Sequence, residues 1–158
     1  MLFRSVIPER SIARLSADGN DVYVVGVDHF WRATWDGSAI AIDESFRPRY
    51  RTLDGQTYGW DAVLTDGAAW FLDNGQGTEG FTGSFRGVTQ STAPLHLVRV
   101  DLTTGAVTLT EICGIPGGVV ANPPAVDPVR RIAVGYDSGN RSEEHTSELQ
   151  SPCNLVCR

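Results

Sequence analysis

The sequence contains no lysine, so its basic residues are all arginines. This preference fits a GC-rich genome better than any particular function. Acidic residues outnumber basic ones by 19 to 13, and the net charge of −6 argues against a nucleic-acid partner, which would require a basic surface. No apolar run approaches the roughly 18 residues that a membrane-spanning helix needs. The sequence also has no nucleophile elbow, zinc-binding motif or catalytic-triad motif.

The residues that are present are typical of a folded, turn-rich β protein. Hydrophobic residues make up 41% of the chain and charged residues 20%, which is the composition of a globular rather than a disordered chain. The 17 glycines and 8 prolines suit frequent turns. No segment has the apolar period of a helix, whereas several short segments are β-branched, aromatic or alternating in polarity.

One unit, made of a short strand, a tight turn and a second strand, occurs three times. Its turns lie at Asp18, Asp66 and Asp127, which gives a repeat of roughly 50 residues. The predicted strands are residues 11–17, 22–27, 30–35 and 39–42 in the first unit, 60–64, 69–72, 95–100 and 106–112 in the second, and 131–136 in the third. The pair Asp36-Gly37 predicts a two-residue hairpin turn between two of these strands.

Four-stranded units at a period of ~40–50 residues are the sequence pattern of propeller blades. We therefore predict an all-β fold, an incomplete β-propeller of about two and a half four-stranded antiparallel blades. The blades are expected within residues 6–140.

Both ends of the chain resemble translated sequencing adapter. Residues 141–151 and 154–158 match an adapter sequence codon by codon on either side of a short variable index, and residues 1–5 match its reverse complement. We expect residues 1–5 and 141–158 to be adapter-derived and the second of these segments to be disordered. Cys153 and Cys157 then leave the cysteine count. The remaining Cys113 indicates neither a disulfide framework nor a metal cluster.

Two segments resemble known propeller families. Residues 100–107, Val-Asp-Leu-Thr-Thr-Gly-Ala-Val, resemble the strand-turn-strand hairpin of quinoprotein-type and YVTN-type β-propellers. The unit with Asp66-Gly67 and Asp73-Asn74-Gly75 is similar to blades of gluconolactonase-type six-bladed propellers. The latter resemblance implies a divalent metal held by carboxylates and an asparagine at the propeller mouth. No Gly-His and Trp-Asp pair recurs at blade spacing, so a WD-repeat protein fits less well.

The loop after the second strand of a blade opens on the central channel, and aspartates recur there. Alignment of the units places Asp28, Asp73 and Asp137 in these loops, and His29 and Asn74 follow the first two. Converging carboxylates repel one another unless a cation lies between them, and oxygen ligands suit Ca²⁺ or Mg²⁺. The alternative is that each aspartate caps its own turn. His29 is either a ligand or base, or a surface residue, and His96 is expected to be structural.

The segment 74–94 is glycine-rich, lacks an apolar period and is predicted to be a loop. Its Phe81, Phe85 and Arg86 are candidate ligand contacts, because long loops in compact domains are usually functional or disordered. The tryptophans are expected to pack between blades. The alternating arginines 47, 49 and 51 suit an anion-binding patch or a solvated strand face.

The leading hypothesis is a propeller scaffold that binds a small molecule or a protein. The alternative is a metal-dependent, lactonase-like hydrolase with Asp73 and Asn74 at the propeller mouth. No membrane span and no nucleic-acid partner are expected.

Overall fold

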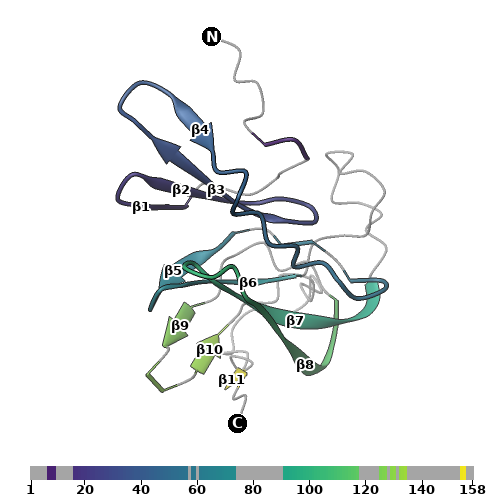
Figure 1. The fold of residues 1–158 in the computed structure, drawn as a ribbon. Helices are drawn as coiled ribbons and strands as arrows, with labels where there is room; N and C mark the ends of the chain where they lie inside the picture. The colour runs from purple at the N-terminus through teal and green to yellow at the C-terminus, as the bar shows by residue number, and fades with distance from the viewer. Residues whose placement is uncertain are drawn as a thin grey trace, which may run out of the picture.

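The computed structural model describes residues 7–9, 16–56, 58–59, 61–73, 91–117, 125–127, 129–130, 132–134 and 154–155. Throughout these residues the regular structure is β, in three antiparallel sheets that follow one another along the chain (Figure 1). The described residues include no helix long and apolar enough to cross a membrane.

The first sheet is a four-stranded meander of β1 (Ser16–Asp18), β2 (Asp21–Val25), β3 (Phe30–Trp35) and β4 (Ile40–Ile42). Gly19, at φ 61°, begins the turn between β1 and β2, a conformation that favours glycine. The predicted two-residue turn at Asp36-Gly37 is wrong, because Trp35 pairs with Ile40 and leaves residues 36–39 as the loop. The Asp36 carboxylate accepts the N–H groups of Ser38 and Ala39, which stabilises this longer turn.

The second sheet has the same order, β5 (Val63–Thr65), β6 (Ala68–Leu72), β7 (Ser91–Asp101) and β8 (Val107–Gly117). Asp66 and Gly67 form its first turn with φ values of 52° and 65°, as a type I′ hairpin requires. β6 and β7 pair directly although the long glycine-rich segment separates them in sequence. β7 begins at Ser91, so the predicted loop extends too far at its C-terminal end.

The third sheet consists of β9 (Ala125–Asp127), β10 (Ile132–Val134) and β11 (Asn154–Leu155), in the order β11-β10-β9. The Asp127 carboxylate accepts the N–H groups of Val129 and Arg130 and so shapes the turn after β9.

A continuous core lies between the first two sheets. Its buried residues are Tyr23, Val25 and Phe30 from the first sheet, Ala69, Phe71, Val98 and Val100 from the second, and Phe46 and Tyr50 from the connector between β4 and β5. A smaller cluster lies on the other face of the first sheet, where Ile7 packs with Val24 and Trp31. The first sheet is therefore covered on one face by the second sheet and on the other by the segment before β1.

The first strands of the sheets touch in series, with β1 in contact with β5 and β5 in contact with β9. The all-β, four-stranded antiparallel part of the prediction is confirmed. The described strands close into neither a barrel nor a propeller ring.

Candidate functional site

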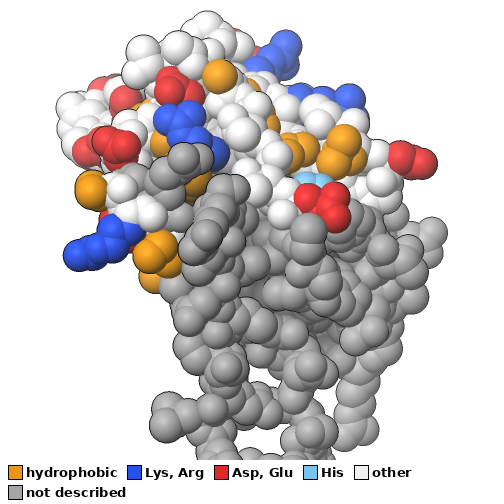
Figure 2. Space-filling view, turned by 90° about the horizontal axis from the view of Figure 1, so that it is seen from below, with side chains coloured by type: hydrophobic (Ala, Val, Ile, Leu, Met, Phe, Trp, Pro, Cys, Tyr) orange, Lys and Arg blue, Asp and Glu red, His pale blue; other side chains and the backbone are white. Residues whose placement is uncertain are grey.

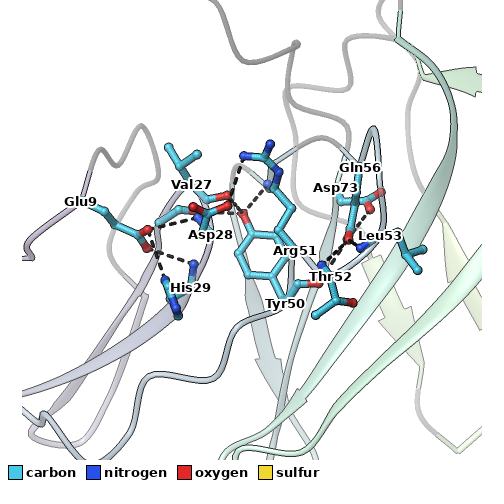
Figure 3. Close-up of polar contacts among 12 residues, drawn as sticks. Glu9, Val27, Asp28, His29, Tyr50, Arg51, Thr52, Leu53, Gln56 and Asp73 are labelled. Atoms are coloured by element: carbon cyan, nitrogen blue, oxygen red, sulfur yellow. Dashed lines mark hydrogen bonds and ion pairs between the residues drawn. The ribbon is translucent and has the colours of Figure 1, made fainter.

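The turn after β2 is docked on the connector between β4 and β5. The Asp28 carbonyl accepts the N–H groups of Tyr50 and Arg51, and His29 forms an isolated antiparallel bridge with Arg49. Phe30 at the start of β3 donates its N–H to the Pro48 carbonyl. These main-chain bonds give the turn at residues 26–29 a fixed position against the connector (Figure 3).

Glu9, from the segment before β1, binds the same turn through its carboxylate. It accepts hydrogen bonds from the main-chain N–H of Asp28 at 3.2 Å and of His29 at 3.0 Å, and from Trp31 Nε1 at 2.5 Å. The Oε2 oxygen, which accepts the Asp28 N–H, also lies 3.4 Å from His29 Nδ1. Within the described residues Nε2 of His29 has no hydrogen-bond partner, and 33% of this side chain is exposed. With Nδ1 as the donor to Glu9, Nε2 carries the acceptor lone pair of the neutral ring.

Asp28 lies at the surface beside Arg51. One carboxylate oxygen is 3.3 Å from the Arg51 guanidinium, and the side chains are 40% and 18% exposed. An ion pair of this exposure contributes little to stability. It leaves charged groups of both signs accessible next to His29.

Tyr50 connects the turn to the interior. Its hydroxyl donates to the Gly26 carbonyl at 2.6 Å and accepts the Gly59 N–H at 2.8 Å. Burial raises the pKa of this hydroxyl far above its usual range, so it stays protonated and remains a donor.

Asp73, directly after β6, is buried with 1% exposure. One oxygen accepts the His96 N–H at 2.6 Å, and the other lies 2.8 Å from Gln56 Nε2 and 2.9 Å from His96 Nδ1. Burial raises the pKa of Asp73 to about 6, against the opposing effect of the hydrogen bonds from His96 and Gln56.

Gln56 joins Asp73 to the exposed loop 52–55. Its Nε2 also donates to the Tyr50 carbonyl, while its Oε1 accepts the N–H groups of Thr52 and Leu53. Both polar atoms of its side chain are thus engaged, and a single connector holds both the turn after β2 and the end of β6.

The structure brings three of the predicted site residues, Asp28, His29 and Asp73, to this connector. The other candidates, Asn74, Phe81, Phe85, Arg86 and Asp137, lie outside the described residues. Among the residues that are described, no group of three or more His, Cys, Asp or Glu side chains is placed to hold a metal ion. The expected structural role of His96 agrees with its burial and its contacts to Asp73.

The alignment of Asp28 with Asp73 is wrong by two residues. Asp18 pairs with Asp21 in the first hairpin and Thr65 with Ala68 in the second, so counting along β2 and β6 from these pairs matches Gly26 with Asp73. Main-chain bonds agree, because the Gly26 N–H donates to the His29 carbonyl and the Asp73 N–H to the His96 carbonyl. His29 and His96 are therefore equivalent.

Sequence reasoning missed Glu9, Tyr50 and Gln56. All three lie in connectors without strand periodicity, and most of their partners are main-chain groups. The one available signal is position, since Glu9 and Gln56 each precede the first strand of a sheet by a similar distance.

The structure also places two of the tryptophans and two of the connector arginines for which the sequence led to expectations. Trp31 is buried with Ile7 and Val24, whereas Trp35 is 41% exposed. Of the three connector arginines, Arg51 pairs with Asp28 and Arg47 with Glu44. On the described part of the face in Figure 2, arginine and acidic side chains are interspersed.

No protein-family model, curated protein or solved structure matches the chain.

Proposed function

We propose that the chain is part of a β-propeller that serves as a binding scaffold for a small molecule or a protein. The observation that carries this proposal is the serial contact of β1 with β5 and of β5 with β9. Each of these is the first strand of its sheet. In a propeller the sheets are arranged radially around a channel, which brings their innermost strands together.

The direction in which the side chains face supports the same arrangement. Val24 and Phe71 are equivalent in register. Phe71 packs on the preceding sheet, and Val24 packs on Ile7 from the preceding segment. Side chains alternate along a strand, so Trp70 and Leu72 point to the opposite face, away from the first sheet. Equivalent residues thus face the same way along the chain, as in successive blades.

The proposed binding region is the exposed part of the connector end. Asp28, His29 and Arg51 present an anionic, an imidazole and a cationic group there, and all three are partly exposed. Binding residues are commonly found on loops that a rigid scaffold positions. The main-chain bonds of the turn and connector supply that rigidity.

The hydrolase hypothesis assigns Asp73 to a metal. A metal at Asp73 would have to displace the hydrogen bonds from His96 and Gln56 and reach a carboxylate that is 1% exposed. This arrangement favours a structural role for Asp73 and hence the binding scaffold. Hydrolysis of a simple lactone by the full chain that depends on added Ca²⁺ or Mg²⁺ would instead support the hydrolase.

The binding proposal can be tested with amide spectra of the ¹⁵N-labelled full chain during titration with a library of small organic fragments. We expect the largest shift changes at residues 26–29 and 51–56. The variant R51A is expected to reduce them, while R47A, which changes a more exposed arginine of the same connector, should not. Shift changes confined to other surfaces, or none with any fragment, would contradict the proposal.

A further inference from the structure

We infer that Glu9 supplies to the first sheet the carboxylate that Asp73 supplies to the second, so that a carboxylate–histidine pair fixes both sheets at the same register position. The inference does not depend on the proposed binding function.

The two histidines occupy equivalent positions. His29 and His96 each lie one residue before a strand pair that ends its ladder, Val25 with Phe30 and Leu72 with Leu97. Each also accepts, through its carbonyl, the N–H of the residue that follows the second-strand member of that pair. In the first sheet that residue is Gly26, and in the second it is Asp73.

Each histidine makes the same two contacts with its carboxylate. Glu9 Oε1 accepts the His29 N–H at 3.0 Å and its Oε2 lies 3.4 Å from His29 Nδ1. Asp73 Oδ1 accepts the His96 N–H at 2.6 Å and its Oδ2 lies 2.9 Å from His96 Nδ1. In each case one oxygen accepts the histidine N–H and the other lies beside the ring, which fixes the orientation of the imidazole. Glu9 Oε2 also accepts the Asp28 N–H, and its Oε1 accepts the Trp31 indole N–H.

The space next to position 26 explains why different residues supply the carboxylate in the two sheets. A Cβ atom on Gly26 would lie 1.9 Å from Glu9 Oε1 and 2.6 Å from its Cδ. The carboxylate of Glu9 therefore fills the space that a side chain at position 26 would need. In the second sheet the equivalent residue is an aspartate, and its own side chain makes the contact.

Because the two carboxylates come from different parts of the chain, the segment before β1 affects the orientation of His29. Asp73 belongs to the sheet that it fixes, whereas Glu9 comes from outside its sheet and is anchored beside Ile7, which packs on Val24 and Trp31. The orientation of His29 thus depends on residues 7–9 being in place, and Glu9 is a positioning residue for His29.

The inference is tested by moving the carboxylate from position 9 to position 26 in the full chain. E9A should lower the folding equilibrium constant by about tenfold or more, because main-chain and indole donors lose a charged acceptor. G26D alone should also destabilise, since its side chain meets Glu9. The double variant E9A/G26D should recover most of the stability lost in E9A. E9A/G26A, which adds the Cβ without the carboxylate, is the matched control and should not recover it.

A second readout separates positioning from packing. The imidazole ¹⁵N shifts of His29 report which ring nitrogen carries the proton, and we expect the native pattern to be lost in E9A and restored in E9A/G26D. If E9A does not fold, recovery of a folded spectrum in the double variant is the expected result. The inference would be overturned if the stability losses of E9A and G26D simply added in the double variant. It would also be overturned if the double variant did not restore the native ¹⁵N shifts of His29.

Discussion

Phe30 of the first sheet stacks on Phe71 of the second, with ring centroids 5.9 Å apart and planes 14° from parallel. Tyr50 from the connector meets the same Phe71 ring edge-on, at 4.9 Å and 87°. Offset and edge-to-face arrangements at these separations are favourable beyond the area that they bury. The association of the two sheets therefore centres on Phe71, together with the connector that leads from one sheet to the next.

Truncation of Phe71 should be among the most damaging changes in the chain. The side chain is fully buried, and F71A is expected to lower the free energy of unfolding by about 3–5 kcal/mol through lost burial and the cavity that remains. Urea unfolding followed by tryptophan fluorescence measures the loss. L53A, at a side chain that is 49% exposed, should change stability by about 0.5 kcal/mol or less. If F71A does not fold, F71L should show a smaller loss in the same direction, and an unchanged midpoint would contradict the packing described.

Gly59 allows the connector to approach this ring. A Cβ at position 59 would lie 2.5 Å from Phe71 Cδ2 and 3.0 Å from Val25 Cγ1. G59A should therefore destabilise the fold by about 1–3 kcal/mol through overpacking. The comparison is G19A, where no atom lies within 4 Å and only the positive φ opposes the methyl group. Thermal melts followed by circular dichroism measure the difference in stability. A G59A variant as stable as the wild type would refute the close approach.

Removal of the Tyr50 hydroxyl should destabilise the fold, although the change removes only one oxygen atom. Y50F removes the donor to the Gly26 carbonyl and the acceptor for the Gly59 N–H. Leaving buried polar groups unsatisfied costs on the order of 1–3 kcal/mol. Amide hydrogen exchange provides the specific readout, because the Gly59 N–H should exchange faster in Y50F relative to core amides such as that of Val98. Equal protection in both proteins would count against the hydrogen bond.

Asp73 should give the fold a distinctive pH dependence. Burial raises its pKa to about 6 in the folded chain, above its ordinary value of 3.8. The folded chain then binds the proton more tightly than the unfolded chain. This contribution to stability is present below about pH 4 and is lost as the pH rises through about 6.

The measurement is the difference in unfolding free energy between wild type and D73N at several pH values. Relative to D73N, the wild type should lose up to about 3 kcal/mol between pH 4 and pH 7, at roughly 1.4 kcal/mol per pKa unit. The Asp73 ¹³Cγ shift should titrate over the same range. Parallel stability profiles for the two proteins, or a carboxyl that titrates near pH 4, would contradict the prediction.

The strands could be predicted from sequence because local residue types determine them. Val22, Val24 and Val25 favour extended backbone, and the turns at Asp66-Gly67 and Gly105 use residues that tolerate positive φ. The pairing of β6 with β7 was predictable in order but not in extent, because β7 begins before the alternating segment that identifies it.

The candidate site was harder to predict, because its geometry depends on register. Asp18 and Asp66 look alike in sequence, but Asp18 is the last residue of β1 whereas Asp66 lies within the turn itself. Aligning the two units on these aspartates is therefore wrong by one residue, and matching Asp28 with Asp73 is wrong by two. Glu9 binds main-chain and indole N–H groups about twenty residues away in sequence. No local sequence pattern predicts a partner at that separation.

The central claim is that the sheets are successive repeats whose first strands lie innermost. Nuclear Overhauser spectroscopy of the full chain tests it most directly. The account predicts cross-peaks between the rings of Phe30 and Phe71, between residues of β1 and β5, and between residues of β5 and β9. Cross-peaks that instead pair β4 with β5 as neighbouring strands, giving one continuous sheet, would contradict it.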